Sequence, residues 1–186
     1  MRKLIYSMTT SLDGFIADPD GEIDWTAPDE ELFRFHTEQT RGLGVHLCGR
    51  RLYEAMLYWE TADSDPAVGE ASEEFAPIWR ALPKIVFSTS LKTVEGNARL
   101  ATDGLAEEVA RLKREDGADI AVGGAGLAGE CARLGLIDEY RLFVSPVVLG
   151  GGTRFFPALD ARIGLSLVET RTFGSQVHYM RYRVAG

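Results

Sequence analysis

The sequence predicts an α/β fold in which a mostly parallel central sheet has helices on both faces and an antiparallel C-terminal edge. Short apolar runs typical of buried strands are followed by helical segments four times along the chain. Residues 164–173 and 177–184 then alternate apolar and polar side chains around a Gly-Ser-Gln turn, as the strands of a hairpin do. With 186 residues and 45% hydrophobic content, the chain is expected to form a single domain over residues 1–186.

The N-terminal third predicts two strand–helix units. Residues 4–10 form the first strand, and turn signals at 11–14 and 18–21 indicate a loop that arches over a site. Pro28 and the acidic residues after it suit a helix N-terminus, and this helix extends to about Gln39. A buried strand at 45–48 leads through Gly49 directly into a second helix.

The rest of the chain continues the same alternation. Residues 58–69 are polar and predict a surface loop, and residues 70–82 predict a helix. A strand at 84–87 and a weak strand at 98–101 precede an amphipathic helix at 104–114. The run 120–122 predicts a buried strand, the helix after it ends near Gly135, and residues 140–149 predict a long strand.

Composition excludes several classes of function. The net charge of −8 and a pI near 4.9 argue against a nucleic-acid binder, whose affinity depends on neutralising phosphates. No run of 18 apolar residues predicts a membrane span, and the N-terminus shows no signal-peptide pattern, so a cytoplasmic protein is expected. No metal-ligand spacing relates His36, His46 and His178 to each other or to Cys48 and Cys131, so no metal site is expected.

A glycine-rich turn at residues 123–127 is the clearest candidate site. It joins the strand at 120–122 to a helix, and the unpaired N–H groups of a first helical turn suit a phosphate or pyrophosphate. The alternative is a tight turn that binds no ligand. Residues 124–129 match GxGxxG, but the next strand ends at 144–150 without the acidic residue that a Rossmann site places against the ribose. We therefore expect a dinucleotide pyrophosphate bound in a different way.

Two other strand ends have groups suited to an anion. Arg50 and Arg51 begin a helix, where cations oppose the macrodipole, so an anionic partner is a reasonable inference; alternatively they pair with acids or point to solvent. Residues 88–90 are hydroxyls at the end of a strand, suited to phosphate oxygens or to ordinary turn formation. Ligands of such sheets bind at the carboxyl ends of the strands, where these segments and the 13–25 loop are all expected.

Four segments together resemble a known group of proteins. They are SLDGFIA (11–17), CGRRLYE (48–54), KIVFSTSL (84–91) and VGGAGLAGECARLGLIDEYRLFVSPVVLGGGTRFF (122–156), in this order over nearly the whole chain. The chain resembles the dihydrofolate-reductase-like superfamily, and more closely its RibD C-terminal reductase domains. The resemblance implies a dihydrofolate-reductase-like three-layer sandwich, NADPH as the cofactor, hydride transfer and a homodimer, for which the residues themselves offer only exposed edge strands.

The resemblance also implies where the cofactor binds. The backbone of Ala17 would contact the nicotinamide amide, and Gly49, Arg50 and Arg51 would face the adenosine-side phosphates. Ser88, Thr89 and Ser90 would lie by the 2′-phosphate. The pyrophosphate would be held by Gly123, Gly124, Ala125, Gly126 and Leu127. An arginine with hydroxyls, and no acid against the ribose, favours NADP over NAD.

The substrate side is less defined. Glu30 aligns with the carboxylate by which folate reducers hold the pterin and assist protonation, or it is an ordinary helix N-terminal acid. Asp13 contacts the substrate or caps its own turn. Trp25 is a candidate substrate contact. Riboflavin-pathway reductase domains commonly have an acid before the glycine pair, where this chain has Val122.

Two functions follow as hypotheses. The first is an NADPH-dependent reductase of a small heterocycle that resembles 5-amino-6-(5-phosphoribosylamino)uracil or a pterin, with Glu30 or Asp13 as its catalytic acid. The alternative is a family member that binds a nucleotide without turnover and has a regulatory or assembly role.

Overall fold

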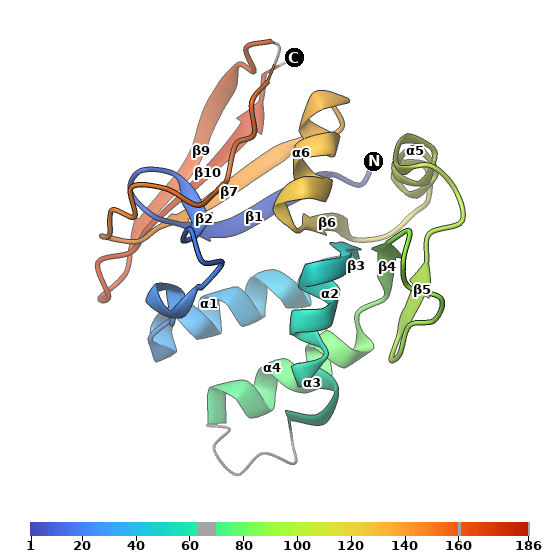
Figure 1. The fold of residues 1–186 in the computed structure, drawn as a ribbon, viewed down its shortest axis with the longest axis horizontal. Coiled ribbons are helices and arrows are strands. Elements are labelled where there is room, and N and C mark those ends of the chain that lie inside the picture. Colours follow the sequence, from blue (N-terminus) through green and yellow to red (C-terminus); the bar gives the residue numbers. More distant parts are fainter. Residues whose placement is uncertain (63–69, 160, 186) are drawn as a thin grey trace.

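The computed structural model describes residues 1–62, 70–159 and 161–185 (Figure 1). The strands are β1 (Leu4–Thr10), β2 (Phe15–Ala17), β3 (Leu43–Gly49), β4 (Lys84–Phe87), β5 (Ala98–Leu100), β6 (Asp119–Gly123), β7 (Glu139–Val144), β8 (Thr153–Arg154), β9 (Leu165–Thr172) and β10 (His178–Val184). The helices are a short 3-10 turn η1 (Asp24–Thr26), α1 (Glu30–Arg41), α2 (Arg50–Met56), α3 (Tyr58–Thr61), α4 (Glu70–Ala81), α5 (Leu105–Arg114) and α6 (Ala125–Arg133).

The central sheet has the order β5-β4-β3-β6-β1-β7-β10-β9. The strands from β5 to β7 are mutually parallel, and β10 runs antiparallel to both of its neighbours. This arrangement confirms the predicted mostly parallel sheet with an antiparallel C-terminal edge. A second, two-stranded sheet pairs β2 with β8 and so ties the loop after β1 to the segment after β7.

Two local predictions are wrong. The strand predicted over 140–149 ends at Val144, because Pro146 has no N–H to donate to the ladder. Part of the predicted loop at 58–69 is the helix α3, since Trp59 packs on Phe75 with ring centroids 4.7 Å apart and Tyr58 packs on Trp59. Residues 63–69 of that predicted loop lie outside the described residues.

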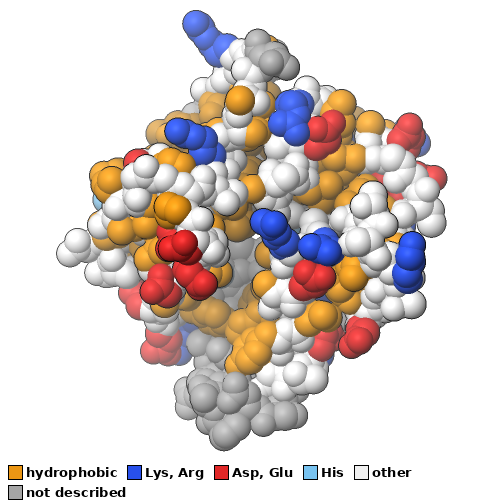
Figure 2. Space-filling model, in the orientation of Figure 1, with side chains coloured by type: hydrophobic (Ala, Val, Ile, Leu, Met, Phe, Trp, Pro, Cys, Tyr) orange, Lys and Arg blue, Asp and Glu red, His pale blue; other side chains and the backbone are white. Residues whose placement is uncertain are grey.

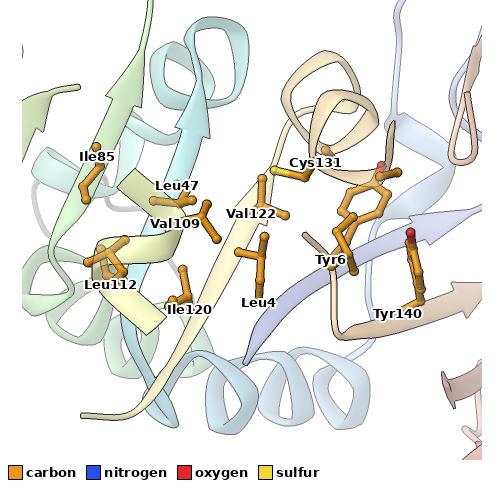
Figure 3. Packing of buried hydrophobic residues seen from close by; sticks show 14 of the residues in the cluster. Leu4, Tyr6, Leu47, Ile85, Val109, Leu112, Ile120, Val122, Cys131 and Tyr140 are labelled. Carbon is orange, nitrogen blue, oxygen red and sulfur yellow. The ribbon is translucent and has the colours of Figure 1, made fainter. Parts of the chain in front are cut away.

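One face of the sheet packs against α5 and α6 through a continuous apolar core. Leu4 and Tyr6 of β1 meet Val109 of α5 and Cys131 of α6 in this cluster, which Figure 3 shows from close by. Both cysteines of the chain are buried free thiols, and burial raises the pKa of each to about 12. At neutral pH they remain protonated, as expected of packing residues.

The opposite face of the sheet packs against α1 and α4 (Figure 1) and differs in having two separate apolar clusters. One joins α4 to β3 and β4 through Trp79, Cys48 and Val86. The other joins α1 to β7 and β10 through Leu32 and Phe143. Between the two clusters, the buried residues Ile5 and Ala121 belong to neither and line the inner cavity described below.

Two searches of the structure concern the described residues only. None of the helices among them is long and apolar enough to cross a membrane. Within the same ranges, no group of three or more His, Cys, Asp or Glu side chains is arranged to hold a metal ion.

Candidate functional site

The carboxyl ends of β4, β3 and β6 lie next to one another at one edge of the sheet. These strands are neighbours and parallel, with Gly49 opposite Phe87 and Cys48 opposite Gly123. The turn after each strand therefore opens on the same side of the molecule. The structure brings together three of the predicted segments: the start of α2, the hydroxyls after β4 and the glycine turn after β6.

The three glycines of the turn differ in whether the structure has room for a side chain at their positions. A Cβ on Gly123 would overlap the Leu52 side chain and lie 2.8 Å from the His46 ring, so close packing requires this glycine. Gly124 has a φ of +91°, and its Cβ position is 3.6 Å from the Gly49 backbone. A Cβ on Gly126 would have no atom within 4 Å. Of the three, only Gly126 leaves backbone open to a ligand.

The first turn of α6 is the part of this segment suited to an anion. No side chain caps the helix, and the N–H of Ala128 donates to the Gly124 carbonyl at 2.9 Å as the first bond of the helix. The N–H groups of Ala125, Gly126 and Leu127 precede that bond, and together with the helix dipole they favour a negatively charged group. The residues present therefore fit a phosphate or pyrophosphate.

An open groove of about 570 Å³ adjoins the end of β4. Its lining includes Arg50 and all three predicted hydroxyl residues, Ser88, Thr89 and Ser90. Arg50 donates to the Ser90 hydroxyl at 3.2 Å, which positions the guanidinium over the groove. The Ser88 hydroxyl accepts from the backbone of Ser90 and Leu91, as in an ordinary turn, so the turn interpretation holds for this residue.

Two charged residues of this region differ from expectation. Arg51 is exposed and is not among the residues that line the groove, although it is adjacent to Arg50. Asp103 does line the groove, together with Arg50. An acidic residue in this groove was not predicted from the sequence. The signal was in the sequence, because the strand 98–101 ends at the same edge of the sheet and Asp103 follows it.

Asp13 lies in the loop after β1, and both of its carboxylate oxygens accept hydrogen bonds from the protein. Its carboxylate accepts from the Ser11 hydroxyl at 2.6 Å, the Leu149 N–H at 3.1 Å and the Gly150 N–H at 2.7 Å. These hydrogen bonds, the one from Ser11 foremost, lower the pKa of Asp13 to about 2. A carboxylate ionised at neutral pH has no proton to give, so the geometry favours the turn-capping alternative over a catalytic acid.

Glu30 and Trp25 lie at the N-terminal end of α1. Glu30 is largely exposed and pairs with Arg34 at 2.5 Å, on a surface groove separate from the strand ends. Asp29 is the capping residue of this helix and accepts from the Leu32 N–H at 2.8 Å. Trp25 is half-buried, and its indole N–H has no acceptor in the described part of the chain. The observed position of Glu30 agrees with the alternative of an ordinary helix N-terminal acid.

Ala17 is held at the rim of the site by the small β2–β8 sheet. It pairs with Thr153, and a Cβ on the neighbouring Gly152 would overlap the Ala17 carbonyl oxygen. Ile16, the residue before it, lines the outer of the two cavities described next. The glycine segment 150–152 and β8 therefore contact the loop after β1, which the sequence predicted to arch over a site, and hold it in place.

Two adjoining cavities lie between α1 and the sheet, and the inner one also contacts α4. The inner cavity, of about 210 Å³, is lined by Ser7, His36, Gln39, His46, Trp79 and Arg141, among others. The outer cavity, of about 240 Å³, opens toward the loop after β1, and its lining includes Thr9, Ile16, Ile23 and Thr26. Ser7 and His36 line both cavities. Figure 2 shows this face hollowed along its middle, with basic side chains over α2 on one side and acidic ones on the other.

The polar residues of the inner cavity were not predicted as site residues. Burial lowers the pKa of both His36 and His46 to about 4, so both imidazoles are neutral at pH 7. His46 contacts the Cys48 sulfur through Nδ1 at 3.3 Å. Arg141 donates to Gln39 and, at 2.7 Å, to the buried carboxylate of Glu139. Alternation along β1, β3 and β7 gives the only sequence signal, since it separates Ser7, His46 and Arg141 from the core-facing residues.

The comparisons with known proteins agree with this architecture. A family model described as the RibD C-terminal domain matches residues 2–179. The protein YyaP of Bacillus subtilis (strain 168) is 34% identical over 186 residues, which span 100% of this chain and 96% of that protein.

Two solved structures show the same fold. A putative riboflavin biosynthesis protein from Shewanella sp. PV-4 has a TM-score of 0.78 and 20% identity, with 99% of each chain covered. Dihydrofolate reductase from Enterococcus faecalis complexed with NADP(H) has a TM-score of 0.63 and 17% identity, with 99% of this chain and 97% of that chain covered. The predicted resemblance and the dihydrofolate-reductase-like fold class are confirmed. The chain belongs to the RibD C-terminal domain family.

Proposed function

We propose that this protein is an NADPH-dependent reductase of a small heterocyclic substrate. The observation that supports it most is that the carboxyl ends of the strands, which suit an anion, lie next to a partly enclosed cavity. The turn at 123–127 and the Arg50 groove suit the phosphates of a dinucleotide, and the cavity around Ser7 and His36 suits a small planar ring. The structural similarity to dihydrofolate reductase from Enterococcus faecalis, which is complexed with NADP(H), supports the same assignment.

Each segment has its own task in this proposal. The N–H groups at the start of α6 bind the pyrophosphate, and Gly49 at the start of α2 lies beside them, with its Cβ position 3.7 Å from the Gly123 carbonyl oxygen. Arg50, with Thr89 and Ser90, binds the 2′-phosphate. The backbone of Ala17 binds the nicotinamide amide at the mouth of the outer cavity. When bound, NADPH supplies a hydride, and the substrate ring lies in the cavities with the loop that contains Trp25 excluding water from it.

The preference for NADPH over NADH depends on Arg50 in this proposal. Asp103 in the same groove repels a 2′-phosphate and favours free ribose hydroxyls. The attraction of Arg50 for the 2′-phosphate must therefore exceed the repulsion by Asp103. A charge-assisted hydrogen bond from Arg50 contributes about 1.5–3 kcal/mol, which corresponds to roughly 10- to 150-fold in affinity.

Calorimetric titration of NADPH and NADH tests the proposal directly. Arg50→Ala is expected to weaken NADPH by about 10- to 100-fold and to leave NADH within about twofold. Arg51→Ala separates the two neighbouring arginines, because Arg51 does not line the groove. Arg114→Ala, at the far end of α5, is the matched control for loss of one positive charge. Equal losses for both nucleotides, or no NADPH binding by the unaltered protein at millimolar concentration, would reject the assignment.

One observation favours the alternative function, a nucleotide-binding protein without turnover. Neither predicted catalytic acid is placed to give a proton in the cavities, because Asp13 is held ionised in a turn and Glu30 pairs with Arg34 outside them. Under this alternative, NADPH binds but is not oxidised in the presence of pterins, ribosylaminopyrimidines or carbonyl compounds. Loss of the absorbance of the reduced nicotinamide with any of these substrates rules it out.

We also propose that the protein is a homodimer formed through the sheet edge at β9. Leu165, Leu167 and Val168 of this edge strand are 37%, 57% and 38% exposed. A long edge strand with exposed apolar side chains is a template for pairing with another copy.

A further inference from the structure

The polar groups of the joined cavities differ from those that a folate-type ring requires. The inner and outer cavities meet at Ser7 and His36, so a ring that occupies them lies against these two side chains. Ser7 comes from β1 and His36 from the sheet-facing side of α1. Both are held by secondary structure rather than by a loop, which fixes their positions before any ligand binds.

The imidazole of His36 is unused by the protein itself. Its ring packs against Phe143 with the centroids 4.2 Å apart, which sets its orientation. Neither ring nitrogen has a hydrogen-bond partner among the described residues, although the side chain is largely buried. A polar group that is held in place, lies in a cavity and lacks a partner is available to a ligand.

No carboxylate in the described part of the chain lines either cavity. Glu139 is nearby but has only 1% of its side chain exposed, and it is paired with Arg141 at 2.6 Å and with Lys3 at 3.5 Å. Val122 lines the inner cavity at the position before the glycine pair. The one charged side chain that lines the inner cavity is that of Arg141, again within the described residues. The cavities are thus neutral to positive.

This chemistry selects between two classes of heterocycle. A 2,4-diaminopyrimidine-type ring is protonated at a ring nitrogen when a carboxylate binds it, and burying that cation without the carboxylate is costly. A ring with carbonyl oxygens instead needs donors, which the hydroxyl of Ser7, the imidazole of His36 and the guanidinium of Arg141 provide. A ring N–H finds an acceptor in the unprotonated imidazole nitrogen or the Ser7 oxygen.

We propose that His36 and Ser7 form the polar contact of the substrate site and restrict it to neutral or anionic, carbonyl-bearing rings, excluding diaminopyrimidine-type cations. This assignment rests on the proposed function in placing the substrate in these cavities. His36 contacts the ring directly and thereby replaces the carboxylate expected at Glu30. The chain is consequently expected to be insensitive to diaminopyrimidine antifolates.

The test uses two probes of the same size, uracil and 2,4-diaminopyrimidine. Uracil has oxo groups at the two ring positions where 2,4-diaminopyrimidine has amino groups. Binding is followed by ligand-detected NMR and by thermal shift of the full chain, with and without NADPH. Uracil is expected to bind at millimolar concentration and at least about tenfold more tightly than the diamino ring. Equal or tighter binding of the diamino ring, or no binding of either probe, overturns the proposal.

Variants of His36 test the assigned residue. His36→Asn removes the imidazole without adding charge and is expected to weaken uracil about fivefold, as the loss of one hydrogen bond requires. His36→Asp adds a carboxylate and is expected to reverse the preference toward the diamino ring. His178→Asn, on the exposed start of β10, is the matched control and should leave both affinities unchanged. An unchanged preference in both folded His36 variants overturns the proposal.

The same measurements separate this inference from the proposed function. NADPH binding is titrated independently with each variant. If NADPH does not bind while the uracil preference and its dependence on His36 are observed, the reductase assignment fails and the ring selectivity stands. If NADPH binds and the diamino ring is preferred, the reductase assignment stands and the ring selectivity fails.

Discussion

Gly152 offers a direct test of how the segment after β7 positions the loop at the mouth of the site. Its φ is +120°, and a Cβ there would overlap the Ala17 carbonyl oxygen and lie 2.7 Å from the carbonyl carbon of Asp18. These are backbone atoms, so no side-chain rotation can relieve the overlap. Gly150 provides a matched control, because its φ is +74° but a Cβ there would meet no atom within 4 Å.

The two substitutions are expected to differ in both stability and cofactor affinity. Each alanine variant incurs about 1–2 kcal/mol for a positive φ. Gly152→Ala also displaces Ala17 from its pairing with Thr153, which adds about 1–2 kcal/mol for one or two hydrogen bonds. A displacement on the order of 1 Å at a positioning segment is sufficient to cost up to about 100-fold in function.

Urea denaturation and calorimetric titration with NADPH measure these two effects. Gly150→Ala should lose about 1–2 kcal/mol and retain its NADPH affinity. Gly152→Ala should lose about 2–4 kcal/mol and bind NADPH at least tenfold more weakly. Equal stabilities and equal NADPH affinities of the two variants would refute both the contact between residues 152 and 17 and the role of the Ala17 backbone.

Three further perturbations test the core, the assembly and the buried histidines. Phe155→Ala should lower the free energy of unfolding in urea by about 3–5 kcal/mol, because the ring is 1% exposed and stacks on the Tyr6 ring with the centroids 4.3 Å apart. Phe156→Ala, at a residue that is 37% exposed, should lower it by about 1 kcal/mol or less. Similar losses in the two variants would contradict this packing. Light scattering should detect a dimer that Leu167→Lys converts to a monomer. Leu134→Lys, at the 48% exposed C-cap residue of α6, should leave the dimer intact, and a monomeric parent protein would contradict the assembly. Burial lowers the pKa of His46 to about 4 in the folded state, against about 6.5 in the unfolded state. As the pH decreases, the unfolded state therefore binds the proton first, and the free energy of unfolding falls between pH 6.5 and pH 4. The urea stability of the parent should therefore lose about 3 kcal/mol more over this interval than that of His46→Gln, and parallel pH profiles would exclude a neutral buried imidazole.

Most of the fold was predictable because each strand and helix has a local pattern of its own. The buried strand at β6, the glycine turn and the apolar spacing of α6 are all contained in fifteen residues, and the structure has these elements where the sequence predicts them. The errors occur where distant residues decide the outcome. The segment at Tyr58 is helical only because Trp59 finds Phe75 across the chain, and no local polarity pattern shows such a contact.

The candidate site also has a part that the sequence predicted, the strand ends suited to phosphate, and a part that it did not, the cavity. Phosphate recognition uses backbone N–H groups and short side chains at strand ends, which leave contiguous sequence signals such as residues 123–127. The proposed substrate cavity instead lies where two apolar clusters on one face of the sheet do not meet. The residues that line it come singly from separate elements, Ser7 from β1, His36 from α1 and Arg141 from β7, and in sequence each resembles an ordinary polar residue. The proposed cofactor site has a contiguous sequence signal and the cavity does not. Members of this family with similar glycine turns are therefore expected to differ in substrate according to the residues at the positions of Ser7, His36 and Arg141.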